Sequence, residues 1–240
     1  MAAAAPALLA VDVGGTRARF ALCDAGGAVL LRRELATGDY ADGAALLQAG
    51  LAALRAPAVP LSLAAAGPRD VDGAVQLTNR SALRLDARAL AAQLHRPVWL
   101  WNDFEALAAG LAEHDPERED GTMVRLGGTL PAPPGPRLVC GPGTGLGTAL
   151  LLEDGTVLAA EGGHATLAAS TPLEHELLGL LTARFGRVSR ERVLSGPGLV
   201  HLAAAFAELE GCAPVGEAPE AIVAAARAGG GAAARVLECF

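Results

Sequence analysis

The sequence predicts an α/β protein built from two related domains that face a cleft. Apolar segments typical of buried strands alternate with segments of helical periodicity, an order typical of helices packed on a mixed sheet. A strand–glycine turn–strand unit also occurs twice, around residues 14–16 and around residues 143–147. Each half of the chain opens with such a unit. This repetition favours two domains of similar construction, with a boundary near residues 103–110.

We set that boundary between residues 104 and 105. The smaller α/β domain, 1–104, would carry the first glycine turn, and the larger domain, 105–240, would carry the second. A chain of 240 residues is long enough for both domains to bury a hydrophobic core.

The first half is expected to contain strands that are joined by short turns and by amphipathic helices. Apolar runs that end at Gly or Asp are typical of buried strands, and Leu46, Leu47 and Leu51 recur at helical spacing. The expected strands are 7–13, 18–24, 28–35, 60–66 and 97–101, and the expected helices are 43–55, 86–94 and 104–113.

The second half follows a loop rich in Pro and Gly, Gly127 to Pro136, and then resumes with strands. These are expected at 137–141, 147–152 and 156–160, with helices over the remainder. One helix should begin near Thr171, because Thr171 and Glu174 have the spacing of a capping box. At the end of the chain, Val236, Leu237 and Phe240 form an apolar stripe that is still running at the last residue. We expect this stripe to be exposed, as if the chain lacked a continuation.

Composition excludes several classes of function. The net charge of −7 argues against nucleic acid or an anionic membrane as the main partner. Every basic residue is arginine, so the chain has neither the lysine of a Walker A loop nor one for Schiff-base chemistry. The four cysteines lack CxxC spacing, and we expect them to be reduced and buried, without disulfide or zinc roles. The apolar start lacks a basic region and leads into a strand, so a cytoplasmic protein is expected.

The sequence DVGGT at 12–16 places an aspartate and two glycines at the end of a predicted strand. Glycines there let the backbone turn tightly and offer N–H groups to phosphate oxygens, which makes Gly14, Gly15 and Thr16 candidate nucleotide-binding residues. Asp12 could hold Mg²⁺ directly or through water. An ordinary hairpin turn with a surface aspartate is the alternative, and this motif alone leaves both open.

The sequence GPGTGLG at 141–147 places four glycines between two predicted strands. Its backbone could hold phosphate without any lysine, so Gly143, Thr144 and Gly145 are further nucleotide-binding candidates. Its spacing fits neither a P-loop nor a Rossmann turn. A flexible loop is the alternative.

The sequence WNDFE at 101–105 follows a predicted buried strand. Asp103 is well placed to accept a proton from a substrate hydroxyl, and Asn102 offers both a donor and an acceptor to neighbouring hydroxyls. A helix N-cap is the alternative, which spacing alone favours, and one segment can serve both purposes.

The fourth candidate group consists of EGGH at 161–164 together with Glu191. Glu161, His164 and Glu191 supply the donors and acceptors that a polyol site requires. A single histidine with distant carboxylates is weak evidence for a metal site. Surface polar residues in a turn remain the alternative.

Taken in order, these motifs resemble those of the bacterial glucokinase family, within the hexokinase–actin–heat-shock-chaperone superfamily. The resemblance spans essentially the whole chain, and the matching stretches are DVGGTRARFALCD, the TNR stretch at 78–80, WNDFEALA, GPGTGLGTALL, EGGH and VSRERVLSGPGLV. It implies a two-domain actin-like ATPase (ribonuclease H-like) fold with an interdomain cleft, of which the C-terminal part is incomplete here.

The resemblance also implies an activity: transfer of the ATP γ-phosphate to the 6-hydroxyl of glucose, as in glycolysis, which gives glucose 6-phosphate and ADP. Asp103 would be the catalytic base. Mg²⁺ would accompany ATP, with Asp12 near the metal, and the two glycine loops would hold the phosphates. The resemblance suggests a homodimer, with no nucleic acid or membrane partner. The residues implied for the other sugar hydroxyls are Asn102, Glu161, His164 and Glu191.

Two departures from the family pattern stand out. Ala82 and Leu83 occupy positions near which the family usually has an aromatic residue. The family also continues for several tens of residues, with a glycine-rich adenosine segment and a helix that returns to the first domain. A sugar-binding protein with impaired catalysis, or an inactive fragment without the adenosine site, is therefore the alternative. The related repressor–kinase group has a zinc motif of clustered cysteines. Cys212 and Cys239 lack that clustered spacing, so membership of this group is not supported.

Overall fold

The computed structural model describes residues 4–77, 83–113, 124, 126–127 and 134–240. The chain divides into two compact units, Met1–Met123 and Val124–Phe240, and each has a hydrophobic cluster of its own. The TNR stretch and Ala82 lie outside the described residues, as does most of the expected loop over 127–136. None of the helices in the described ranges combines the length and apolar character needed to cross a bilayer.

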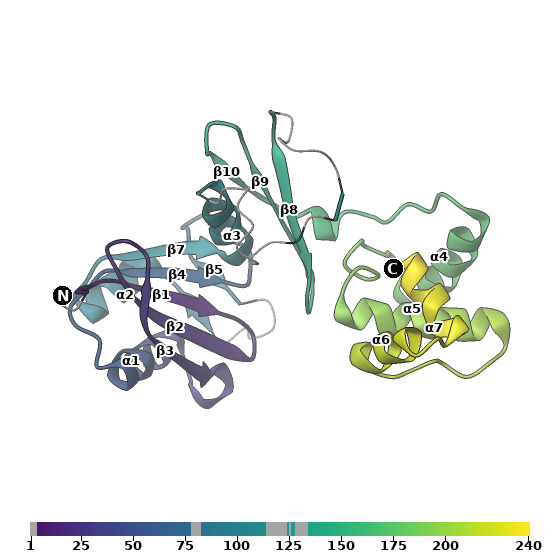
Figure 1. Ribbon diagram of the computed structural model, residues 1–240, viewed down its shortest axis with the longest axis horizontal. Coiled ribbons are helices and arrows are strands. Elements are labelled where there is room, and N and C mark those ends of the chain that lie inside the picture. The colour runs from purple at the N-terminus through teal and green to yellow at the C-terminus, as the bar shows by residue number, and fades with distance from the viewer. Residues whose placement is uncertain (1–3, 78–82, 114–123, 125, 128–133) are drawn as a thin grey trace. The chain divides into compact units, whose positions relative to one another are not determined.

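The first unit is built on a five-stranded mixed sheet in the order β3-β2-β1-β4-β7 (Figure 1). Its strands are β1 (Pro6–Val13), β2 (Arg17–Asp24), β3 (Val29–Ala36), β4 (Leu61–Ala65) and β7 (Val98–Asn102). β2 is antiparallel to both β1 and β3, whereas β1, β4 and β7 are parallel. The carboxyl ends of β1, β4 and β7 therefore meet at one edge of the sheet, the edge where open α/β sheets bind ligands.

The helices of the first unit are α1 (Gly43–Leu54), α2 (Ala87–Leu94) and α3 (Asp103–Ala112). α1 and α2 contact each other and bury a cluster with the inward residues of β1, β4 and β7, among them Leu9, Leu63 and Leu100. Gly50 of α1 is required there, because a Cβ would lie 2.1 Å from the ring of Phe20. α3 packs against β4 and β7. Smaller elements are η1 (Thr37–Asp39) and the hairpin of β5 (Val75–Gln76) and β6 (Arg84–Leu85).

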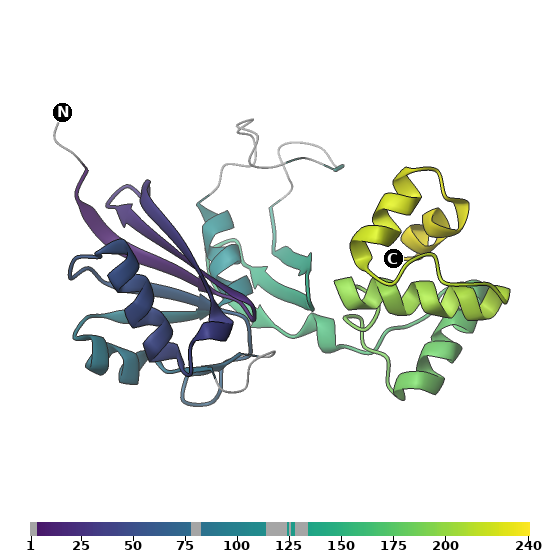
Figure 2. The ribbon, with the colours of Figure 1, turned by 90° about the horizontal axis from the view of Figure 1, so that it is seen from below.

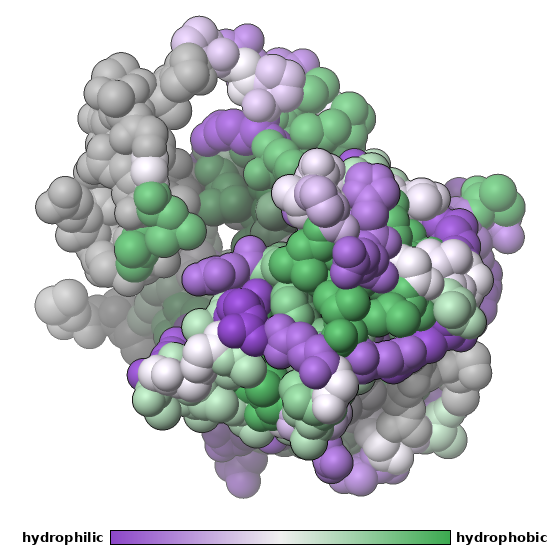
Figure 3. All heavy atoms as spheres, turned by 90° about the vertical axis from the view of Figure 1, so that its right-hand side faces the viewer, coloured by the Kyte–Doolittle hydropathy of each residue, from purple (hydrophilic) through white to green (hydrophobic). Residues whose placement is uncertain are grey.

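The second unit combines a small sheet with a helical bundle. β8 (Arg137–Pro142), β9 (Leu146–Leu151) and β10 (Val157–Ala160) form an antiparallel sheet in the order β10-β9-β8. The bundle consists of α4 (Pro172–Phe185), α5 (Gly196–Glu210), α6 (Pro219–Arg227) and α7 (Gly231–Cys239), with α5 in contact with the other three (Figure 2). Hydrophilic and hydrophobic residues lie side by side on the face of the molecule that Figure 3 shows.

The strands and helices expected with definite bounds are confirmed, each within one residue of the observed bounds, and the remainder after β10 is mainly helical as expected. The capping box at Thr171 and Glu174 is also present. The observed division of the chain falls later than residues 104 and 105, after α3, because α3 packs against β4 and β7 of the first unit.

Two expectations about buried surface are corrected. The C-terminal stripe is covered rather than exposed: Val236 is buried, and Leu237 and Phe240 are half-buried against the cluster formed with α5 and α6. All four cysteines are free thiols, but Cys140 and Cys212 are exposed. Cys140 is on the edge strand β8, and Cys212 follows the end of α5, so neither reaches a core. Burial raises the pKa of the Cys23 thiol.

Candidate functional site

The first part of the candidate site is the junction between β7 and α3. Asn102 is the N-cap of α3: its Oδ1 accepts hydrogen bonds from the N–H groups of Phe104 (2.9 Å) and Glu105 (3.2 Å). Glu105 completes a capping box by accepting the Asn102 N–H at 2.8 Å. The Asn102 Nδ2 donates to the Gly67 carbonyl, beyond the end of β4, at 3.0 Å. The Asn102 side-chain amide thus holds together the end of β7 and the start of α3, and Asp103 lies at this junction.

Asp103 is the first residue of α3 and is half-buried. Burial of its carboxylate is the main reason that its pKa is raised, and the negative charge of Asp12 adds to this rise. The Phe104 N–H, 3.0 Å from Asp103 Oδ1, opposes the rise without cancelling it. A carboxylate with a raised pKa is a stronger base, so this environment suits proton abstraction from a hydroxyl.

The first glycine loop begins at the same edge of the sheet. Asp12 lies near the end of β1, beside Ala64 of β4, and Ala64 is in turn beside Trp101 of β7. Arg19 of β2 donates to Asp12 Oδ2 at 2.8 Å in an exposed ion pair, so one carboxylate oxygen is already engaged.

The turn after β1 is closed by the Gly14 N–H, which donates to the Arg17 carbonyl at 2.9 Å. In the described part of the chain, the N–H groups of Gly15 and Thr16 donate to no protein acceptor. These two donors therefore remain available to an anion.

The second glycine loop joins β8 to β9. Its Gly143 carbonyl accepts the N–H of Gly196, at the start of α5, at 2.8 Å. The Leu146 N–H donates to the carboxylate of Glu191 at 2.8 Å, and a Cβ on Gly145 would lie 2.3 Å from the same oxygen. Over the described ranges, the N–H groups of Thr144 and Gly145 have no protein acceptor. This loop therefore also has free backbone N–H donors, and the Glu191 carboxylate fixes its end through the hydrogen bond from Leu146.

The EGGH turn is held against the second glycine loop. The Thr148 hydroxyl of β9 donates to the Ala160 carbonyl and accepts the Gly162 N–H, both at 2.9 Å. Gly163 is buried so close to the Leu146 carbonyl that a Cβ would lie 2.2 Å from that oxygen. The Gly163 carbonyl in turn accepts the Glu191 N–H at 2.9 Å.

The polar ends of the turn are exposed and face each other. His164 Nε2 lies 3.6 Å from Glu161 Oε2, within reach of the same small polar ligand. The Arg187 guanidinium donates to the His164 carbonyl at 2.8 Å and fixes the end of the turn.

The predicted residues thus gather into two groups, one in each unit. Asp12, Asn102, Asp103 and the loop at 14–16 share the sheet edge of the first unit. The remaining predicted residues, which lie together in the second unit, are Gly143, Thr144, Gly145, Glu161, His164 and Glu191.

Sequence reasoning missed two buried threonines that support these groups, Thr37 and Thr148. Thr148 lies directly after the second glycine motif, and this position beside the loop is the local signal that could have found it. Thr37 carries no comparable local signal.

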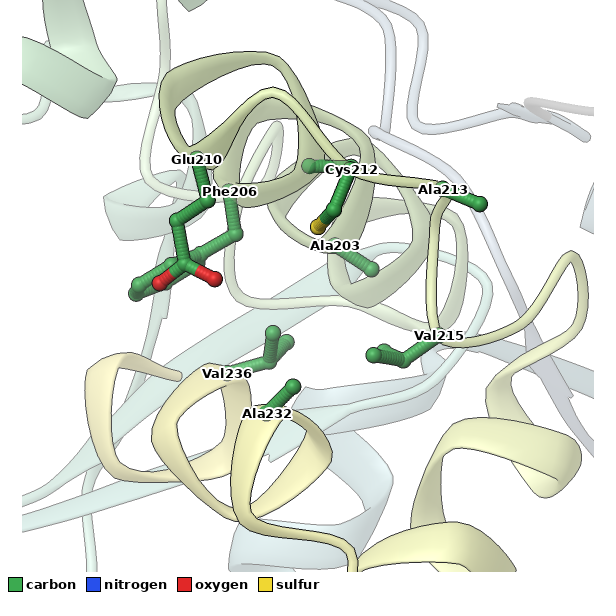
Figure 4. Close-up of a pocket in the computed structure, with 9 residues that line it drawn as sticks. Ala203, Phe206, Glu210, Cys212, Ala213, Val215, Ala232 and Val236 are labelled. Atoms are coloured by element: carbon green, nitrogen blue, oxygen red, sulfur yellow. The ribbon is translucent and has the colours of Figure 1, made fainter.

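A shallow pocket in the second unit lies outside both groups (Figure 4). It is lined mainly by apolar side chains of α5, α7 and the segment after α5, including Phe206, Val215 and Val236. None of the predicted site residues lines it.

Comparison with known proteins identifies the family. A family model described as Glucokinase matches residues 9–240. The chain is 40% identical over 228 residues to a glucokinase of Aromatoleum aromaticum, which covers 90% of this chain and 66% of the relative. It is 39% identical over 230 residues to a glucokinase of Marinobacter nauticus, covering 90% of this chain and 67% of the relative. The chain thus spans about two thirds of the length of these relatives.

Among solved structures, a glucokinase from an Antarctic psychrotroph matches with a TM-score of 0.76 at 29% identity, over 96% of this chain and 73% of that one. The match confirms the predicted actin-like kinase fold. With its sequence match nearly end to end and its fold shared with a solved glucokinase, the chain belongs to the glucokinase family.

Proposed function

We propose that this protein is an ATP-dependent glucokinase, which transfers the γ-phosphate of ATP to the 6-hydroxyl of glucose. The observation that carries the proposal is the half-buried Asp103 carboxylate, with its raised pKa, at the sheet edge that also bears the first glycine loop. A base for a hydroxyl and free backbone donors for phosphate are the two parts that phosphoryl transfer needs. The relatives named glucokinase support glucose as the acceptor.

In the proposed reaction, Asp103 accepts the proton of the 6-hydroxyl as that oxygen attacks the γ-phosphorus and ADP departs. Backbone N–H groups of the two glycine loops stabilise the charge on the phosphate oxygens, which replaces a P-loop lysine. Asn102, Glu161, His164 and Glu191 are proposed to bind the other sugar hydroxyls. The Asn102 amide already caps α3, so a hydroxyl would share it with the helix.

Mg²⁺ is the proposed companion of ATP, and the donor set fits a weakly held ion. No cluster of three metal-ligating side chains occurs in the described ranges, and Asp12 offers one carboxylate that is shared with Arg19. Mg²⁺ is commonly held by one or two carboxylates, substrate phosphates and water, which matches this arrangement. When bound, the ion would neutralise phosphate charge, with Asp12 as its protein contact.

The test is a coupled ADP-release assay with glucose and Mg-ATP. Asp103→Ala should abolish turnover and leave glucose affinity within about tenfold of the wild type, because the base acts only in the chemical step. The control is Asp72→Asn, which should retain activity. Asp72 is exposed, and its carboxylate oxygens accept no hydrogen bond within the described residues. Near-normal turnover by Asp103→Ala would refute the assignment of the base.

Glucose binding without turnover by the wild-type chain would instead favour the sugar-binding alternative, in which Glu161, His164 and Glu191 keep their roles. A cytoplasmic location, where ATP is supplied, and a homodimer are part of the main proposal. Sedimentation equilibrium would test the dimer.

A further inference from the structure

Thr37 is a buried polar residue whose bonds end on the first glycine loop. It opens η1, directly after β3, and its exposed fraction is 0%. Its hydroxyl donates to the Gly15 carbonyl at 2.8 Å, and its backbone N–H donates to the Thr16 carbonyl at 3.0 Å. Two consecutive peptide groups of the loop are therefore held by one residue 22 positions away from Gly15.

These two bonds determine where the loop donors point. In a trans peptide the C=O and the following N–H point to opposite sides. Holding the Gly15 carbonyl toward Thr37 therefore turns the Thr16 N–H away from the protein interior. The Thr16 N–H is one of the donors without a protein acceptor in the described part of the loop.

Packing alone does not account for this arrangement. The backbone bond from Thr37 to Thr16 continues the β2–β3 pairing beyond Arg17 and Ala36, and any residue other than proline would make it. Valine would fill nearly the same space as threonine. The hydroxyl bond to Gly15 is the part that requires threonine or serine.

We propose that Thr37 is a positioning residue of the first phosphate loop, which aims the Thr16 N–H at a nucleotide phosphate without itself touching the substrate. The proposal rests on the proposed function, and it adds a requirement that the glycine motif does not contain. The loop needs a hydroxyl from the end of β3 to hold its peptide planes.

The test compares Thr37→Val with Thr37→Ser in the full chain. Thr37→Val should raise the KM for Mg-ATP about five- to tenfold, the size expected for loss of one hydrogen bond, and leave the KM for glucose within about twofold. Thr37→Ser should restore wild-type values. Amide hydrogen exchange at Gly14 and Thr37, whose N–H groups close the loop, should speed up about fivefold in Thr37→Val and not in Thr37→Ser.

Equal losses in both variants, or parallel rises in the KM for ATP and for glucose, would show a general packing role and overturn the proposal. Unchanged exchange in Thr37→Val would also overturn it, and this readout needs no turnover. If Thr37→Val does not fold, Thr37→Ala is judged by the same exchange and by Mg-ATP affinity from calorimetry. Wild-type chain that binds Mg-ATP without turnover would contradict the proposed activity alone. Wild-type chain that does not bind Mg-ATP would contradict both.

Discussion

At the scale of single residues, the pKa of Asp103 is raised mainly by burial of its carboxylate, and the negative charge of Asp12 adds to the rise. The base must be ionised to work, so kcat/KM should fall as the pH drops through this raised pKa. Asp12→Asn removes one of the two causes and should move the acid limb of the profile to lower pH, whatever it does to the absolute rate. A pH–rate profile of the variant, with Asp72→Asn as control, measures this. An acid limb that stays in place would show that Asp12 does not act on the base.

The same pKa predicts an effect on stability. Because the pKa of Asp103 is higher in the folded than in the unfolded chain, stability is lost as the pH rises through the folded pKa. Asp103→Asn should therefore raise the Tm at neutral pH while it abolishes turnover. The gain should vanish at a pH below the ordinary pKa of aspartate, where both side chains are neutral. Thermal melts at the two pH values test this, and an equal Tm difference at both would contradict it.

Asn102 and Asp103 could be predicted from the sequence, because the polar pair follows an apolar strand segment and precedes a helical one. The cap and the proposed base are both compatible with the structure, since the Asn102 side chain makes the cap and Asp103 follows it. The effect of Asp12 on Asp103 was not accessible in this way. It depends on β1 and β7 both pairing with β4, which brings together residues far apart in the chain.

At the scale of elements, the EGGH turn depends on close contact with the second glycine loop. In Gly163→Ala the new methyl would meet the Leu146 carbonyl, a backbone atom that cannot rotate away. We expect a loss of about 1–3 kcal/mol of stability and weaker glucose binding, because Glu161 and His164 would be displaced together. Calorimetric titration with glucose and a urea melt measure the two effects.

The matched control is Gly179→Ala, in the interior of α4, where a Cβ meets nothing within 4 Å. It should stabilise the protein by about 0.5–1 kcal/mol, because alanine loses less backbone entropy in a helix. If the two variants bound glucose equally well, the turn would not depend on its contact with the loop.

Most elements were predictable because glycine turns and helix caps leave clear signals at their ends. The β5–β6 hairpin was not, since strands of two residues, Val75–Gln76 and Arg84–Leu85, carry no periodicity. Thr37 was missed for a related reason: its role is set by the pairing of β2 with β3, while its own neighbours look like an ordinary turn.

At the scale of the whole chain, each unit has its own hydrophobic cluster. Leu63 is fully buried in the first cluster, and Leu202 is buried in the second. Replacing either by alanine should cost about 2–5 kcal/mol. In hydrogen exchange, Leu63→Ala should lower protection in β1 and β4, and Leu202→Ala in α5 and α7. If each substitution lowered protection equally in both clusters, the clusters would not be separate stabilising units.

The repeated strand–glycine turn–strand signal indicated two halves, but not how differently they are built. The first glycine turn belongs to a five-stranded mixed sheet, and the second to a three-stranded antiparallel sheet beside a bundle. The turns look alike in sequence because each joins two strands through glycines, and both are proposed to hold phosphate. The sheets around them are set by long-range pairing, such as β4 with β1, which a local motif does not encode.

The two tryptophans of the chain, Trp99 and Trp101, both lie on β7 and are both partly exposed. Tryptophan fluorescence, excited at the long-wavelength edge of protein absorption, therefore comes from this strand, which ends next to Asp103. The second unit contains no tryptophan and contributes none of this fluorescence. The protein thus contains an intrinsic optical reporter within two residues of its proposed base. Changes in that emission would follow ligand arrival at the sheet edge without any attached dye.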